Sequence, residues 1–224
     1  MSETIAIIGG TGPEGRGLAT RLAMAGHAIV LGSRDAERGA AIAAELAESL
    51  GGRVAAGALR GTGNAEACAE ATLAIVTVPY AAHAATLELL RAPLAGKLVI
   101  DAAVPVRFER GPRPVEVEAG SATEEAAALL PDSTVVGAFH NLDAESLLDP
   151  DARVDADVLV TGGAEGKQRA SALAEQIEGV RAVDAGPLRF SRFVEGLTIL
   201  LIGLNGRHKA HTGVRIAGLP PPSR

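Results

Sequence analysis

Short apolar runs alternate along the chain with longer segments whose apolar residues recur at helical spacing. The short runs predict strands over residues 4–8, 28–31, 54–59, 73–78, 97–101, 134–138, 158–161 and 181–184. The longer segments predict helices over residues 13–24, 36–50, 64–71, 81–91, 122–130 and 166–178. This alternation is typical of an α/β fold built on a doubly wound sheet, and we expect that architecture here.

The alternation stops after Asp184, where Gly186-Pro187 interrupts the pattern. Residues 190–205 then predict one long helix. Because this helix is too apolar to be exposed on one face, it is expected to pack against a second subunit or over an active site. We therefore expect a sheet domain over residues 1–185 and a short, mainly helical C-terminal part over residues 186–224.

Two further segments lie outside the regular pattern. Residues 107–118 combine prolines with charges of both signs, so we expect a surface excursion rather than an element. Residues 219–224 are rich in proline and are expected to form a frayed tail.

Composition narrows the kind of core and of partner. Apolar residues make up 47% of the chain but aromatic residues only 2%, so the core must consist of aliphatic side chains, which suits parallel strands buried on both faces. The net charge of −6 argues against nucleic acid or an anionic membrane as the main partner. Cys68 is the only cysteine, which excludes an intrachain disulfide and a thiolate metal cluster, and we propose no metal site.

The chain shows no sign of export or of a membrane span. The N-terminus enters a strand with no basic segment before it. The longest apolar segment, residues 197–204, is far too short to cross a bilayer. A cytoplasmic protein is expected.

The first strand runs into a glycine-rich turn in which Gly10, Gly12 and Gly15 fit the pattern G-x-G-x-x-G. In a dinucleotide-binding turn the first glycine permits the tight bend, the second lets the backbone approach a diphosphate, and the third lets the helix pack on the strand. The helix that follows directs its free N–H groups at the phosphates, and Pro13 suits its first turn. The alternative is a strand–turn–helix unit without a ligand, but the strand–helix–strand order around this turn favours a Rossmann-type nucleotide site.

The end of the second strand selects between two dinucleotides. NAD-binding proteins place an Asp or Glu there to bind the ribose 2′-hydroxyl. This chain instead reads Ser33-Arg34, with Arg38 one helical turn further on. A hydroxyl and guanidinium groups would bind a 2′-phosphate, which predicts NADP rather than NAD. The alternative is that Arg34 and Arg38 pair with Asp35 and Glu37 on the surface.

Other informative residues follow the later strands, whose carboxyl ends face a bound cofactor in such a sheet. Tyr80 could flank a nicotinamide or be a half-buried packing residue. His140 could donate to a substrate carbonyl or a flavin-like oxygen, or be a structural histidine. A basic cluster near the C-terminus is either a solvated helix end or a cradle for an anionic substrate: Arg207, His208, Lys209, His211 and Arg215.

Several segments together resemble a known family. They are the Gly-Gly-Thr-Gly-x-x-Gly turn with Ser33-Arg34, Thr77-Val-Pro79, Val104-Pro-Val106, Ala138-Phe-His140, and Asp184-Ala-Gly-Pro-Leu188 with Ser191-Arg192 and Leu197-Thr198. The chain is similar over nearly its whole length to the F420-dependent NADP reductases, also called F420H2:NADP oxidoreductases. The tail from Leu201 to Leu219 resembles the bacterial branch.

The resemblance implies direct hydride transfer between NADP(H) and the deazaflavin coenzyme F420, with the protein aligning the two rings. It implies that NADP is held by Gly10, Thr11, Gly12, Pro13, Glu14, Gly15, Ser33, Arg34, Arg38, Val78, Val104 and Ala144. It implies that F420 meets His140, as the catalytic residue, with Arg192 and Thr198, under the C-terminal helix as a lid.

Two departures from the family pattern concern affinity rather than the reaction. Gly196 stands where archaeal members carry a serine. Pro13-Glu14 replaces a turn that usually contains Asn or Asp, and it places a carboxylate near the diphosphate. We expect a homodimer with F420 as its small-molecule substrate.

Two other functions remain open at the level of sequence. One is another NADPH-dependent reductase, which acts on imines or carbonyls. Such a reductase would need a longer C-terminal helical bundle for its dimer than the residues after Asp184 provide. The other is a non-catalytic NADP-binding protein.

Overall fold

The computed structural model describes residues 2–220. Its strands are β1 (Thr4–Ile8), β2 (Ala28–Ser33), β3 (Leu59–Gly63), β4 (Leu73–Val76), β5 (Leu98–Asp101), β6 (Val106–Phe108), β7 (Pro112–Pro114), β8 (Thr134–Gly137), β9 (Ala156–Gly162) and β10 (Val180–Asp184). Its α-helices are α1 (Pro13–Met24), α2 (Ala36–Leu50), α3 (Asn64–Glu70), α4 (Tyr80–Leu94), α5 (Ala122–Leu129), α6 (Ala144–Leu148), α7 (Ala164–Ala174) and α8 (Ser191–His208). Short 3₁₀ turns lie at Gly51–Arg53 and Leu188–Phe190. Of the expected frayed tail, residues 221–224 lie outside the described residues.

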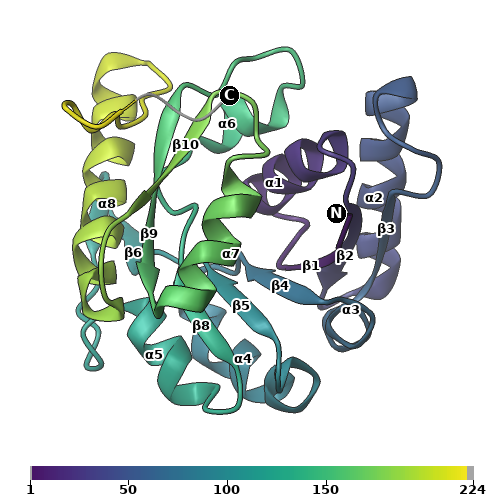
Figure 1. The fold of residues 1–224 in the computed structure, drawn as a ribbon, viewed down its shortest axis with the longest axis horizontal. Helices are drawn as coiled ribbons and strands as arrows, with labels where there is room; N and C mark the ends of the chain where they lie inside the picture. The colour runs from purple at the N-terminus through teal and green to yellow at the C-terminus, as the bar shows by residue number, and fades with distance from the viewer. Residues whose placement is uncertain (1, 221–224) are drawn as a thin grey trace.

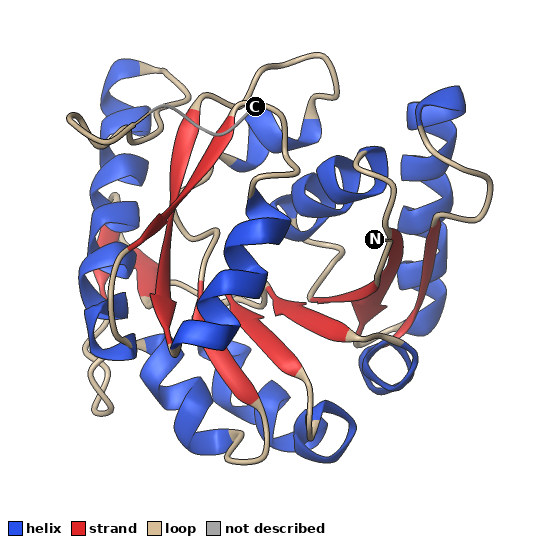
Figure 2. Cartoon of the chain, viewed as in Figure 1, coloured by secondary structure: helices blue, strands red, loops and turns tan. Residues whose placement is uncertain are grey.

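Eight strands form one sheet in the order β10-β9-β8-β5-β4-β1-β2-β3 (Figures 1 and 2). Six neighbouring strands of this sheet, β8, β5, β4, β1, β2 and β3, are parallel to one another. This arrangement confirms the Rossmann-type architecture. The direction reverses at the next strand, because β9 pairs with β8 antiparallel through Val136 and Gly162. β10 then pairs with β9 in parallel, so both strands at this end oppose the other six.

Helices cover both faces of the sheet, and the alternation along each strand separates two apolar cores. In β1, Ile5 and Ile7 face the core that lies under α1, α2 and α7, whereas Ala6 and Ile8 face the core under α3, α4 and α5. Cys68 is fully buried in the second core, as an inert packing residue would be. Among the described residues, no helix has the length and apolar character needed to cross a membrane.

The strand expected over residues 54–59 was wrong, because β3 begins only at Leu59 and continues to Gly63. The preceding segment turns at Gly57, whose φ is +76. The register from Ile29 opposite Leu59 to Ser33 opposite Gly63 places β3 beside the whole of β2. A side chain at Gly61 would overlap the backbone of Gly39, so α2 packs directly on the strand and the strand lacks an apolar signature.

The surface excursion expected over residues 107–118 was also wrong in part, because a two-stranded hairpin forms there. β6 and β7 pair antiparallel, with Val106 opposite Pro114 and Phe108 opposite Pro112. Proline is tolerated in a strand at the edge of a sheet, where its missing N–H leaves no ladder bond unmade. The sequence did not predict helix α6.

Arg21 explains how the short helix α6 is held. Its guanidinium reaches from α1 to the carbonyl oxygens of Leu147 at 2.8 Å and Ser146 at 2.6 Å. It also donates to the carbonyl oxygen of Ala152 at 2.7 Å. One buried cation therefore satisfies carbonyl groups at the end of α6 and holds that helix against α1, the helix that follows the glycine-rich turn.

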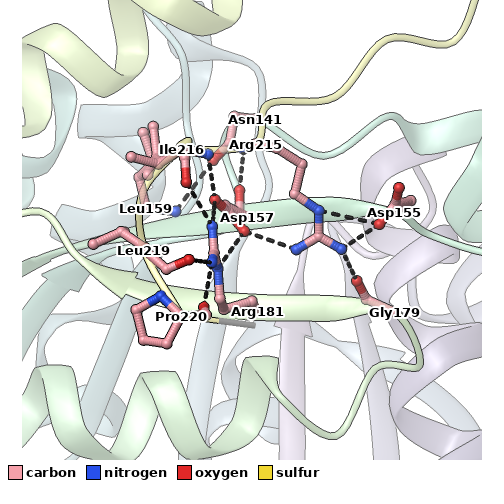
Figure 3. A network of polar contacts seen from close by, with 10 residues as sticks. All are labelled: Asn141, Asp155, Asp157, Leu159, Gly179, Arg181, Arg215, Ile216, Leu219 and Pro220. Carbon is pink, nitrogen blue, oxygen red and sulfur yellow. Dashed lines mark hydrogen bonds and ion pairs between the residues drawn. The ribbon is translucent and has the colours of Figure 1, made fainter. Parts of the chain in front are cut away.

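After α8 the chain runs back along β9 as a segment that we call the C-terminal strap, residues 209–220. The strap is fixed at Asp157, which is fully buried in β9 (Figure 3). The Asp157 carboxylate accepts hydrogen bonds from Arg181 of β10 and from Arg215 and the Ile216 amide of the strap. Burial favours the neutral acid, but these donors hold the pKa of Asp157 below its usual range.

Candidate active site

Two adjoining cavities lie at the carboxyl ends of the parallel strands. The first has a volume of about 600 Å³ and lies between the glycine-rich turn and the start of α2. The second has a volume of about 680 Å³ and lies between the turn after β5 and helix α8. Both are lined by Pro13, Glu14, Thr77, Val78 and Pro79, so the two cavities meet at these residues.

The glycine-rich turn shows a different reason for each glycine. A side chain at Gly10 would lie 2.7 Å from the carbonyl oxygen of Ile7, and one at Gly15 would lie 2.6 Å from the Cα of Gly10. Both positions are therefore closed by packing within the protein. A side chain at Gly12 would meet only the Gly9 carbonyl oxygen, at 3.4 Å, and Gly12 lines the first cavity. The backbone at Gly12 is thus open to a ligand.

The opposite end of the first cavity is cationic. Ser33, Arg34 and Arg38 all line it, and neither arginine forms an ion pair with any residue in the described range 2–220. Asp35 does not pair with them, because its carboxylate caps α2 by accepting from the Arg38 amide at 3.1 Å. The structure thus brings together the three residues that the sequence assigned to a 2′-phosphate, and it does not show the alternative surface pairs.

The second cavity is mainly apolar. Val78, Val104 and Ala144 line it, together with Leu201 and Ile202 of α8. Thr198 also lines it, although the hydroxyl donates within α8 to the Val194 carbonyl oxygen at 3.0 Å. An apolar cavity of this kind suits a flat ring system more than a charged substrate.

His140 lines the second cavity three residues after the end of β8, and it is 4% exposed. The preceding residue, Phe139, has a φ of +69, a rare conformation for a residue with a side chain. The His140 Nε2 atom lies 3.5 Å from the Thr123 hydroxyl, and Nδ1 has no partner among the described residues. Burial lowers the pKa of His140 to about 4, against the opposing effect of Asp101, so the ring is neutral near pH 7.

Behind His140 lies a buried carboxylate that sequence reasoning missed, Glu195 of α8, which is 1% exposed. It accepts hydrogen bonds from the amides of Ala122 and Thr123 at 3.0 and 3.1 Å and from the Thr123 hydroxyl at 3.0 Å. Burial nevertheless raises the pKa of Glu195 to about 7. A single carboxylate within an otherwise apolar helix was the signal that could have identified it.

A second missed group is His83 of α4, which is fully buried between two carboxylates. Its Nε2 lies 3.1 Å from Asp101, and its Nδ1 lies 3.0 Å from Glu125. Burial alone would lower the pKa of His83, but Asp101 and Glu125 together raise it to about 9. Tyr80 lines the second cavity and reaches the same cluster, since its hydroxyl donates to Glu125 at 3.4 Å.

Arg192 is not brought into the site. It lines neither of the two cavities, and its guanidinium lies 3.3 Å from Glu124. The basic cluster near the C-terminus also does not form a cradle for an anionic substrate. Arg215 is bound to Asp155 and Asp157 inside the strap contact, and His211 lies 3.1 Å from Asp143.

Comparison with known proteins identifies relatives over nearly the whole chain. A family described as NADP oxidoreductase coenzyme F420-dependent matches residues 4–105. The F420-dependent NADP reductase of Methanothermobacter marburgensis is 43% identical over 226 residues, which cover 96% of this chain and 99% of the relative. The F420-dependent NADP reductase of Methanocaldococcus jannaschii is 40% identical over 220 residues, which cover 96% and 98%.

Solved structures agree with this relationship. A crystal structure from Arthrobacter sp. FB24, described as a candidate F420-dependent NADP reductase, superposes with a TM-score of 0.81 at 27% identity and covers 96% of this chain and 100% of that one. An imine reductase from Pseudomonas sp. has a TM-score of 0.61 at 14% identity and covers 93% of this chain but 64% of that one, which shows a shared fold alone. From identities of 40% and above along almost its full length, the chain belongs to the F420-dependent NADP reductase family.

Proposed function

We propose that this protein transfers a hydride directly between NADP(H) and coenzyme F420. The observation that carries the proposal is the junction of a cationic cavity with an apolar one at Val78 and Pro79. Two ligands bound in these cavities would meet end to end, so that a hydride could pass directly from one to the other. When bound, NADPH supplies the hydride and F420 accepts it, and the protein's part is to align their rings.

The first cavity fits NADP(H). Ser33, Arg34 and Arg38 would hold the 2′-phosphate, because two unpaired guanidinium groups face a cavity with no competing ion pair in the described chain. The diphosphate would lie along the open backbone of the turn, held by Gly10, Thr11, Gly12, Pro13, Glu14 and Gly15. Val78, Val104 and Ala144 would then contact the nicotinamide half at the entrance of the second cavity.

The second cavity fits the ring system of F420. Its apolar walls exclude water from a hydride transfer, which prevents loss of the hydride to solvent. The neutral His140 would orient the ring through a hydrogen bond rather than supply a charge, and Thr198 would contact the same ring from α8. We retain Arg192 as a candidate for the exposed part of F420, which would require release from Glu124.

Residues 186–224 would form a separate functional part that covers the F420 site. Phe193 and Leu200 of α8 are 66% and 58% exposed, and Phe108 of the hairpin is 69% exposed. Exposed apolar side chains of this size favour burial against a second subunit, which supports a homodimer. A cytoplasmic enzyme without a nucleic-acid partner agrees with the net charge of −6.

The test is an assay with purified protein, NADPH and oxidised F420, in which the absorbance of the oxidised deazaflavin is followed. Loss of that absorbance in proportion to NADPH consumed supports the proposal. Tight NADPH binding without turnover of F420 at any pH would instead favour a non-catalytic NADP-binding protein. Turnover of imines or carbonyls but not F420 would favour the other reductase class.

A further inference from the structure

Glu14 lies at the point where the two cavities meet. It is the second residue of α1, directly after Pro13, and it lines both cavities. Its Oε1 atom is buried and has no hydrogen-bond partner among the described residues. A buried carboxylate oxygen without a donor is costly, so this side chain is not explained by the fold of the protein alone.

The charges around Glu14 come from several elements. From α6, Asp143 faces it, and burial followed by the Asp143 charge raises the pKa of Glu14 to about 8. Arg34 and Arg38 line the first cavity with Glu14, but neither pairs with a carboxylate in the described residues. Arg16 lies on the same helix, and its Nε is likewise without a partner.

Asp143 itself cannot relieve the repulsion, because its carboxylate has fixed tasks. It caps α6 by accepting from the amide and hydroxyl of Ser146, both at 2.8 Å. It also lies 3.1 Å from His211 of the strap, whose ring reaches Glu145 at 3.6 Å. The negative charge facing Glu14 is therefore held in place by α6 and the strap.

A dinucleotide at the glycine-rich turn adds two further negative charges beside the same helix end. These charges and an ionised Glu14 would repel each other in a partly buried space. We propose that Glu14 takes up a proton from solvent when a dinucleotide diphosphate binds at the glycine-rich turn. The inference rests on the proposed function, since it takes NADP(H) as the ligand of the first cavity.

Proton uptake fixes how the affinity for NADPH depends on pH. Binding of NADPH raises the pKa of Glu14 further. The affinity for NADPH is therefore highest below the pKa of Glu14 in the free protein and falls as the pH rises above that value. Above about pH 8 the wild-type dissociation constant is expected to rise about tenfold per pH unit relative to Glu14→Gln. Below about pH 7 the two proteins should differ little, because Glu14 is already mostly protonated.

The experiment is isothermal titration calorimetry of NADPH into wild type and Glu14→Gln at pH 7, 8 and 9. Each titration is run in two buffers with different ionisation enthalpies, which gives the number of protons taken up on binding. For wild type we expect uptake that rises toward about one proton at pH 9, and for Glu14→Gln no such rise. Glu14→Met, a second neutral variant, serves if the glutamine variant does not fold.

A second ligand separates the diphosphate from the 2′-phosphate. Adenosine 2′-monophosphate fits the end of the cavity at Ser33, Arg34 and Arg38 but carries no diphosphate. Protonation changes of the 2′-phosphate appear with both ligands and in both proteins, so they cancel in the comparison. We expect no difference in proton uptake between wild type and Glu14→Gln with this ligand.

Equal proton uptake by wild type and Glu14→Gln with NADPH at pH 9 would overturn the role of Glu14. That result would leave NADPH binding and F420 reduction intact, and thus the proposed function. Failure of the proposed function appears differently, as absence of NADPH binding or absence of F420 turnover in wild type.

Discussion

The carboxylate of Glu195 on α8 accepts hydrogen bonds from both the amide and the hydroxyl of Thr123, the second residue of α5, at 3.1 and 3.0 Å. The Ala122 amide also donates to Glu195 at 3.0 Å, so two of the free N–H groups that begin α5 are donors to this carboxylate, and the Glu124 amide donates to the Ser121 hydroxyl at 3.1 Å. The C-terminal helix thereby supplies the anion for the first turn of a helix in the sheet domain, directly behind His140.

The burial of Glu195, which outweighs these hydrogen bonds in its effect on the pKa, predicts a pH-dependent stability. The folded-state pKa of Glu195 is raised to about 7, so the folded protein binds the proton more tightly than the unfolded chain does. Stability from this group is present below about pH 4.5 and is lost as pH rises through 7. Between pH 4.5 and 8 we expect the wild-type free energy of unfolding to fall by up to about 3 kcal/mol relative to Glu195→Gln.

Urea denaturation of the two proteins across this pH range measures the difference. Glu88→Gln, an exposed substitution on α4, is the control and should follow wild type at every pH. If the free energy of unfolding changes with pH in the same way for wild type and Glu195→Gln, the raised pKa of Glu195 is contradicted.

Replacing two glycines of the glycine-rich turn by alanine is expected to have different effects, one on stability and the other on NADPH binding. Gly15→Ala would force a methyl group against Gly10 and Thr77, and we expect a loss of about 1–3 kcal/mol in unfolding free energy. Gly12→Ala fits the protein itself but fills space next to the first cavity, so NADPH should bind about tenfold more weakly or worse. Thermal denaturation and NADPH titration of both variants separate folding from binding. Normal NADPH binding by Gly12→Ala would place the diphosphate elsewhere.

Arg34 is expected to distinguish the phosphorylated cofactor from the unphosphorylated one. Arg34→Ala should weaken NADPH binding about tenfold or more, the loss expected for one charged hydrogen bond, and leave NADH binding nearly unchanged. Fluorescence titration with both cofactors is the measurement. Arg91→Ala on the exposed side of α4 is the matched control. An equal loss for NADPH and NADH would refute the 2′-phosphate assignment.

Two of the buried histidines, His140 and His83, should titrate on opposite sides of neutrality. Burial lowers the pKa of His140 to about 4, whereas Asp101 and Glu125 overcome the burial of His83 and raise its pKa to about 9. Nuclear magnetic resonance of the imidazole nitrogens between pH 5.5 and 8 should therefore show His140 neutral and His83 charged throughout. A midpoint near pH 6.5 for His140 would contradict its buried environment.

Asp157 predicts a large cost for a single substitution. Arg181 is 8% exposed, so Asp157→Ala leaves a buried guanidinium without its carboxylate. We expect a loss of about 3–5 kcal/mol in unfolding free energy, with faster hydrogen exchange at the Ile216 amide. Arg53→Ala removes the exposed ion pair with Asp151 and should cost far less. Similar losses for both variants would show that the strap contact is weak.

The parts of the fold that could be predicted from sequence depend on local signals. β1, the glycine-rich turn and α1 follow from an apolar run, three glycines and a helical repeat that are all within 24 residues. The reversed direction of β9 could not be predicted, because an apolar run reads the same in both directions. β3 was misplaced because Gly61, rather than an apolar residue, occupies the position where α2 packs on it.

The candidate site divides in the same way. Ser33, Arg34 and Arg38 are close in sequence and were found together in the first cavity. Glu195 and its partner Thr123 are 72 residues apart, and His83 and Glu125 are 42 residues apart, so only the folded chain reveals these pairs. Arg192 was assigned by resemblance, and its pairing with Glu124 depends on how α8 packs on α5.

The strap contact at Asp157 also sets an order for biosynthesis. β9 leaves the ribosome well before the strap that completes the contact to its buried carboxylate, since Arg181 follows Asp157 by 24 residues but Arg215 and Ile216 follow it by 58 and 59. The six parallel strands can assemble on the nascent chain, but the reversed edge of the sheet gains its second arginine, Arg215, only when synthesis is nearly complete. Polypeptides released early would therefore contain the six parallel strands with the glycine-rich turn but an unprotected edge of the sheet. Such fragments are prone to aggregation and proteolysis.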